Sequence, residues 1–165
     1  MNPFFTHIEN KNKIEGAPYI VDKRHWGTAV TLDANTRVNY IFDEPSLHFH
    51  THRTEDYILY SGEMEVYRGT WYENDLEKTV AGLEATHMIP GDRVIIAPGI
   101  VHIPINLSPE GSTFIEVSHG PYAEKDVIRV YDKSGRDIDL AKKWQSLGYQ
   151  AEVGVKELIT LIKNK

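Results

Sequence analysis

The chain has 165 residues, 41% of them hydrophobic and 25% charged, with a formal net charge of −6 at pH 7. This length and apolar content predict one domain with its own core and exclude a wholly disordered chain. The acidic balance excludes nucleic acid as the main partner, because binding to a duplex needs a net basic surface.

The sequence also lacks features that define other classes of protein. It has no cysteine, which excludes disulfides, thiolate metal ligands and cysteine nucleophiles. The N-terminal stretch MNPFFTHIENKNK has no basic region followed by an apolar core, so we expect no secretory signal. No window has the roughly 18 apolar residues of a membrane span. We therefore expect a cytoplasmic protein that has no membrane partner.

The first 132 residues are rich in short segments with the composition of β-strands. These segments concentrate Val, Ile, Tyr, Phe and Thr, and turn-forming residues separate them. They cover residues 19–23, 28–33, 36–42, 46–50, 55–60, 63–69, 93–98, 101–107, 112–118 and 126–132. Strands at this spacing predict an all-β fold, an antiparallel sandwich or barrel.

Two short helices are expected at the C-terminal end. Leu140, Trp144 and Leu147 have the spacing i, i+4, i+7, with Asp137 placed as an N-cap and Gly148 as a terminator. A second segment repeats the helical pattern at Val155, Leu158, Ile159 and Ile162. We predict a barrel domain over residues 1–136 and a helical extension over 137–165, packed on the barrel or on a partner subunit.

Three histidines and a glutamate are concentrated in SLHFHTHRTEDYILYSG, residues 46–62. His48 and His50 point to the same side of a strand, because side chains alternate. Glu55 is an odd number of residues further along, so unbroken alternation would place it on the opposite side. A turn through residues 51–54 would bring Glu55 into the next strand, facing the same interior.

A second stretch, GDRVIIAPGIVHIPIN at residues 91–106, adds a further histidine. Pro98-Gly99 predicts a turn, and His102 follows it near the start of a strand. The candidate metal ligands are then His48, His50, Glu55 and His102. Three neutral imidazoles and one carboxylate suit one divalent transition metal ion, namely Fe, Mn, Ni or Zn.

These two stretches resemble the two motifs of the cupin superfamily. Residues 48–62 fit H-x-H-x(4)-E-x(6)-G, and residues 91–106 fit G-x(5)-P-x-G-x(2)-H-x(3)-N, with Ala97 in place of the first proline. The resemblance implies a double-stranded β-helix, or jelly-roll barrel, that is often a homodimer. It also implies a metal held inside by the four ligands above. A cupin that keeps the barrel without a metal is the alternative.

A narrower resemblance is to the type II mannose-6-phosphate isomerase domain. It rests on KRHWG (23–27), SLHFHTHRTEDY (46–57) and FIEVSHGPYAEKDVIRVYDKSGR (114–136), whose order and spacing match that family. His48 replaces a glutamine of the family pattern and makes the ligand set that of the archaeal cupin glucose-6-phosphate isomerases. Asp56, Tyr57 and Ser118 also depart from the pattern, and we expect them to line the pocket.

The resemblance implies aldose–ketose isomerisation of sugar phosphates, such as mannose-6-phosphate and fructose-6-phosphate. This reaction moves a proton between C1 and C2 through an enediolate, which a divalent metal stabilises. The candidates for the base are Glu55, then His52, then Glu116, an acid within the apolar strand FIEV whose burial would raise its pKa.

Fixed cations would bind the phosphate group of such a substrate. Arginine suits this role because its planar guanidinium binds phosphate oxygens in bidentate fashion. The candidates are Arg24, Arg53, Arg129 and Arg136, which occupy matching positions in the resemblance segments. Two other functions remain open: an Fe(II)-dependent dioxygenase on the same ligand set, and a non-catalytic cupin that binds metal or sugar.

Overall fold

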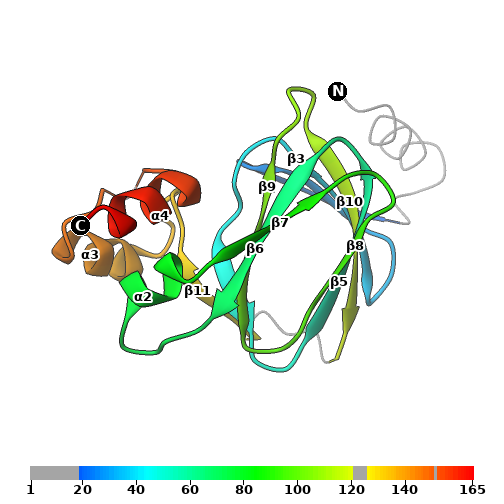
Figure 1. Ribbon diagram of the computed structural model, residues 1–165. Coiled ribbons are helices and arrows are strands. Elements are labelled where there is room, and N and C mark those ends of the chain that lie inside the picture. Colours follow the sequence, from blue (N-terminus) through cyan, green and yellow to red (C-terminus); the bar gives the residue numbers. More distant parts are fainter. Residues whose placement is uncertain (1–18, 121–125, 151) are drawn as a thin grey trace.

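Two antiparallel sheets form a barrel in the computed structural model, which describes residues 19–120, 126–150 and 152–165 (Figure 1). The six-stranded sheet has the order β1 (Ile20–Arg24), β2 (Gly27–Thr31), β3 (Thr36–Ile41), β10 (Ser112–His119), β5 (Thr54–Ser61), β8 (Arg93–Ile96). The five-stranded sheet has the order β11 (Val127–Tyr131), β4 (Leu47–His50), β9 (Ile100–Asn106), β6 (Met64–Thr70), β7 (Glu84–Met88). The predicted all-β fold is confirmed.

The connection between the two motifs contains two elements that the sequence did not predict. Strand β7 is an edge strand that pairs with β6, and only Met88 of its five residues is buried. Helix α2 (Leu76–Ala81) has six residues, and the Asp75 carboxylate accepts the Lys78 backbone N–H at 2.8 Å. Both elements have six residues or fewer, so neither is long enough to produce a clear hydrophobic periodicity.

Apolar side chains fill one part of the barrel interior. They come from alternate positions of the strands, as expected when one face of each strand is buried. The cluster contains Ile41, Tyr57, Leu59, Met64, Val66, Met88, Val94, Ile96 and Phe114. This packing leaves the remainder of the interior to polar side chains.

The helices cover the outer face of the five-stranded sheet (Figure 1). Helices α3 (Ile138–Ser146) and α4 (Val155–Lys163) confirm the two predicted C-terminal helices, and the Asp137 carboxylate caps the first of them. Trp144 is buried against this sheet and its indole N–H donates to the Val130 carbonyl at 2.8 Å. In the described ranges, no helix is long and apolar enough to cross a membrane.

The division of the chain at residue 136 remains a prediction. Residues 1–18 of the predicted barrel domain lie outside the described residues. One apolar cluster contains residues of both proposed parts, including Leu47 and Ile103 from strands and Trp144 and Leu158 from helices. The helical extension therefore shares its core with the barrel that it covers.

Glu44 anchors helix α4 to the barrel, and its replacement by alanine should destabilise the protein. The helix begins after Gly154, which has no capping side chain, and the Glu44 carboxylate accepts the Val155 backbone N–H at 2.8 Å. We expect Glu44→Ala to lower the free energy of unfolding by about 1 kcal/mol, measured by urea denaturation. The exposed Glu152 is the control; an equal loss in Glu152→Ala would contradict the role of Glu44.

Candidate metal centre

Three strands from two sheets bring the predicted ligands together. His48 and His50 lie on β4, and the chain then turns at residues 51–53 and enters the opposite sheet with Glu55 on β5. Strand β9 lies beside β4 and places His102 directly opposite His48. Gly99 has a φ of 79°, which favours glycine, and its N–H donates to the His50 carbonyl at 2.7 Å. The turn predicted between His50 and Glu55 is confirmed, and so are the strands predicted before and after it.

Glu55 lies at the centre of this cluster. Its Oε1 is 2.9 Å from His50 Nε2, and its Oε2 is 3.1 Å from His102 Nε2. One ligand atom from each of the four residues lies within 4.8 Å of the others. Tyr57 donates its hydroxyl hydrogen to Glu55 Oε2 at 2.8 Å, and Arg53 Nη2 is 2.9 Å from Glu55 Oε1. The four side chains thus converge on a volume suited to one ion.

The hydrogen bonds around the imidazoles fit a metal site. His48 Nδ1 is 2.8 Å from the Ser46 carbonyl, and His102 Nδ1 is 3.0 Å from the Ile100 carbonyl. A carbonyl oxygen only accepts, so each Nδ1 carries the proton and each Nε2 keeps a lone pair for a metal. Such outer contacts fix both the tautomer and the orientation of a ligand histidine.

The charge states also fit a metal site. Burial and the neighbouring His102 lower the pKa of His48 to about 3, so this imidazole is neutral at pH 7. Burial opposes ionisation of Glu55, but its close contacts with His102 and His50 outweigh it and hold the pKa of this carboxyl well below its usual range. A neutral imidazole and a carboxylate are the protonation states that bind a divalent metal.

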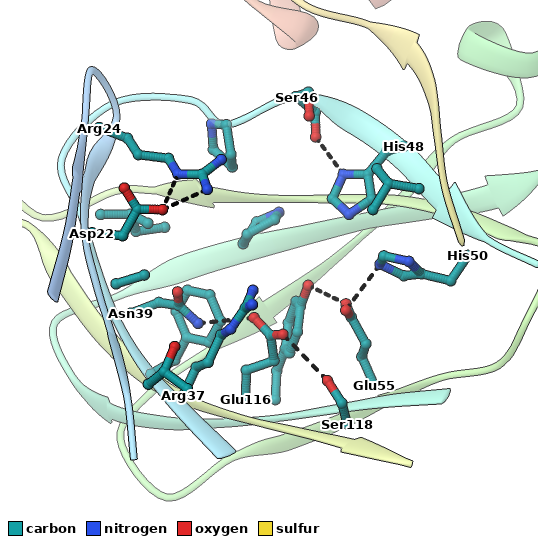
Figure 2. Close-up of a pocket in the computed structure, with 18 of the residues that line it drawn as sticks. Asp22, Arg24, Arg37, Asn39, Ser46, His48, His50, Glu55, Glu116 and Ser118 are labelled. Carbon is teal, nitrogen blue, oxygen red and sulfur yellow. Dashed lines mark hydrogen bonds and ion pairs between the residues drawn. The ribbon is translucent and has the colours of Figure 1, made fainter. Parts of the chain in front are cut away.

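A cavity of about 440 Å³ lies beside this cluster. Figure 2 shows His48, His50 and Glu55 at one side of it and Arg24 with Asp22 at the other. All four predicted arginines line this cavity, and so does a fifth that the sequence did not predict: Arg24, Arg53, Arg129, Arg136 and Arg37. Carboxylates orient three of them: Arg53 contacts Glu55, and the other two are Arg24 and Arg136. Arg24 Nε donates to Asp22 at 2.6 Å, and Arg136 Nε donates to the buried Asp132 at 2.8 Å.

Glu116, on β10, is a second carboxylate in the wall of the cavity. Its Oε2 accepts the Asn39 amide N–H at 2.9 Å, and the Ser118 hydroxyl donates to Oε1 at 3.4 Å (Figure 2). Burial and the nearby charge of Glu55 raise the pKa of Glu116 to about 7. A carboxyl with this pKa exchanges protons near neutral pH, as a general base requires.

Two predicted pocket residues lie elsewhere. The side chain of His52 is 74% exposed and is absent from the cavity wall, because His52 lies in the turn before β5 begins. The prediction for Asp56 is wrong: Glu55 and Tyr57 point inward, so Asp56 points outward and binds Arg93. Tyr57 and Ser118 line the cavity as predicted.

Arg37 and Asn39 are cavity residues that sequence reasoning missed. Both lie on β3, which pairs with β10 and places Arg37 opposite Glu116. In TRVNYI, Arg37 and Asn39 alternate with apolar residues. This alternation was the signal in the sequence that the two polar side chains share one face of a strand. Their proximity to Glu116 depends on a pairing between distant strands.

Known structures that resemble this chain contain the same type of barrel. No family model matches the sequence, and no curated protein matches it either. The capsular polysaccharide assembling protein CapF from Staphylococcus aureus matches with a TM-score of 0.57 at 16% identity, over 71% of this chain and 33% of CapF. This chain therefore spans about a third of the length of CapF.

Two further structures support the comparison. The Drosophila melanogaster CENP-C cupin domain matches with a TM-score of 0.50 at 12% identity, over 61% of this chain and 70% of that domain. A single-residue variant of the oxalate decarboxylase of B. subtilis matches with a TM-score of 0.55 at 18% identity, over 85% of this chain and 36% of that enzyme. At these identities the likeness establishes the fold alone. The chain has the cupin fold.

Proposed function

We propose that this protein is a metal-dependent isomerase that interconverts aldose and ketose sugar phosphates, such as mannose-6-phosphate and fructose-6-phosphate. One observation carries the proposal: three of the four clustered residues, His48, His50 and Glu55, line a single cavity together with five arginines and the raised-pKa carboxyl of Glu116. The arginines favour a phosphorylated substrate over a neutral one. The sequence resemblance to type II mannose-6-phosphate isomerases supports the choice of sugar.

The four clustered residues would hold the metal ion, and Glu116 would move the proton. A bound divalent ion would supply Lewis-acid stabilisation of negative charge on the substrate oxygens. Glu55 is a poor base in this arrangement, because both of its oxygens already contact His50, His102, Tyr57 or Arg53. Glu116 would take the proton from C1 or C2 and return it to the neighbouring carbon.

Arg136 would bind the phosphate group, and its replacement should weaken substrate binding. Asp132 holds the Arg136 side chain before substrate arrives, so little side-chain entropy is lost on binding. We expect Arg136→Gln to raise KM for a sugar phosphate about 10- to 100-fold and to change kcat little, since a charged hydrogen bond contributes about 1.5–3 kcal/mol.

The control for this prediction is Lys142→Gln, which removes one positive charge from an exposed position on α3. Steady-state kinetics on the two variants would separate a local contact from a general effect of charge. An unchanged KM in Arg136→Gln would place the phosphate elsewhere in the cavity.

Proton NMR in D2O tests the proposed reaction directly. Mannose-6-phosphate, glucose-6-phosphate and fructose-6-phosphate would each be incubated with the Fe(II), Mn(II), Zn(II) and Ni(II) forms of the protein. We expect fructose-6-phosphate and one of the two aldose phosphates to interconvert, with deuterium at C1 of the ketose formed and at C2 of the aldose formed. Absence of exchange in protein shown to contain metal would refute isomerisation, and oxygen consumption would then indicate a dioxygenase.

A further inference from the structure

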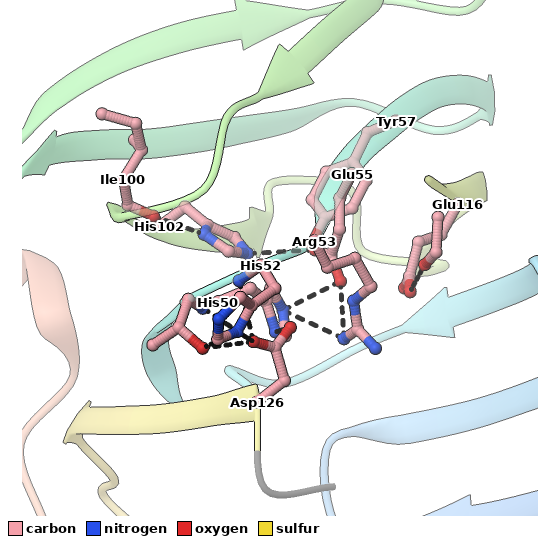
Figure 3. Close-up of polar contacts among 11 residues, drawn as sticks. His50, His52, Arg53, Glu55, Tyr57, Ile100, His102, Glu116 and Asp126 are labelled. Carbon is pink, nitrogen blue, oxygen red and sulfur yellow. Dashed lines mark hydrogen bonds and ion pairs between the residues drawn. The ribbon is translucent and has the colours of Figure 1, made fainter. Parts of the chain in front are cut away.

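Two buried polar atoms face each other behind one of the metal ligands. His50 Nδ1 and Asp126 Oδ2 are 3.6 Å apart, and both side chains are almost fully buried (Figure 3). Within the described residues, neither atom has a hydrogen-bond partner. A buried polar atom without a partner is costly, so this pair needs an explanation.

The other oxygen of Asp126 is firmly held. Oδ1 accepts the backbone N–H groups of Thr51 and His52, both at 2.9 Å, and the Thr51 hydroxyl at 2.5 Å. These bonds fix the carboxylate immediately before β11, against the residues that follow β4. Oδ2 is thereby aimed at His50, because rotation of the carboxylate would break bonds that Oδ1 makes.

His50 is the exception among the three clustered histidines. The Nδ1 atoms of His48 and His102 each lie within hydrogen-bond distance of a backbone carbonyl, whereas His50 Nδ1 faces a carboxylate. From the opposite side, the His50 ring is approached by Glu55 and Arg53, which contact Nε2. An outer acceptor at Nδ1 is what a ligand histidine requires in order to present Nε2 to a metal.

We infer that Asp126 is the positioning residue for the metal ligand His50: the charged Oδ2, 3.6 Å from Nδ1, favours a proton on that nitrogen and so fixes the tautomer that binds metal through Nε2. This inference rests on the metal site of the proposed function and is independent of which reaction that site performs. Asp126 also ties the ligand strand β4 to β11, the strand that carries Arg129. One carboxylate therefore aligns the metal site with the wall of the substrate cavity.

Asparagine cannot replace Asp126 in this role, although it has the same shape. If the amide oxygen faces the N–H groups of Thr51 and His52, the NH2 group faces His50 Nδ1 and opposes a proton there. If the amide is flipped, its NH2 group meets two backbone N–H donors. In both orientations a donor faces a donor. Asp126→Asn therefore disfavours the metal-binding tautomer with little change in volume.

Metal affinity measured by chelator competition tests the inference. We expect Asp126→Asn to bind Zn(II) and Co(II) about 10- to 100-fold more weakly than the wild-type protein. The matched control is Asp132→Asn, since Asp132 is an equally buried aspartate, 5% exposed like Asp126, that bonds Ser134 and Arg136 and contacts none of the ligands. The control should bind both ions within about threefold of wild type.

Nitrogen-15 NMR of the zinc-loaded, histidine-labelled protein supplies a signature that a structural defect would not mimic. Wild type should show three zinc-bound imidazoles protonated at Nδ1, and Asp126→Asn should show two. Equal affinity in Asp126→Asn and wild type, or an equal loss in the Asp132→Asn control, would overturn the inference. Wild-type protein that binds no metal would overturn the metal site as well, whereas metal binding without isomerisation would overturn only the proposed function.

Discussion

Replacement of His102 by alanine is expected to abolish tight metal binding and to lower kcat/KM by about 10³-fold. His102 is fully buried, and its Nε2 lies 3.1 Å from Glu55 Oε2 at the centre of the cluster. The alanine variant keeps two histidines on one short strand and one glutamate from the opposite sheet. It loses the ligand contributed by β9. Metal content after dialysis and the NMR assay would measure the two effects.

The control for this prediction is His87→Ala. His87 is half-exposed on the edge strand β7, where its Nε2 is 3.6 Å from Glu63, and it does not belong to the cluster. It should keep wild-type metal content and activity. A His102→Ala protein that still binds one equivalent of metal and turns over sugar phosphate would show that the reaction does not use this cluster.

Replacement of Glu116 by glutamine should lower kcat by about 10²- to 10⁴-fold while leaving metal affinity unchanged. Glutamine keeps the shape of the side chain but cannot accept the substrate proton. The pH dependence follows from the raised pKa of about 7: the carboxylate is the active form, so wild-type kcat/KM should rise as the pH increases through 7. Full turnover in Glu116→Gln would identify another base in the cavity.

The same side chain should make stability depend on pH. Its pKa is about 7 in the folded protein and about 4.5 when unfolded, so the folded state favours the protonated form. The resulting stabilisation is fully present below pH 4.5 and is lost as the pH rises through 7, by up to about 3 kcal/mol. Glu116→Gln should remove this loss, and urea denaturation at pH 5 and pH 8 would measure it. The exposed Glu63, replaced by glutamine, is the control.

Three of the four metal ligands were predictable from local spacing in the sequence, whereas His102 was predictable from the second cupin motif, because its place opposite His48 depends on the pairing of β9 with β4. His48 and His50 alternate on one strand, a turn separates them from Glu55, and Pro98-Gly99 precedes His102. The two amphipathic C-terminal helices were also predictable from local spacing, since each presents one apolar face.

Features that depend on pairing between distant strands were not predictable. Arg37 and Asn39 reach Glu116 only because β3 pairs with β10, and Asp126 reaches His50 only because β11 pairs with β4. Single-sequence periodicity shows which side of a strand is buried but not which strand lies next to it. The place of His52 in the turn before β5 was not predictable for a different reason, because strand ends cannot be located to within one residue from a sequence.

Strand β4 has only four residues, and they alternate between two environments. Leu47 and Phe49 belong to the apolar cluster beneath the helices, whereas His48 and His50 face the barrel interior. A slip of one residue in pairing would expose both imidazoles to the helices and both apolar side chains to the cavity. The wrong register would thus lose the hydrophobic core and the ligand set together. Burial of Leu47 and Phe49 therefore selects the strand register that metal binding requires, and it does so in the metal-free protein as well.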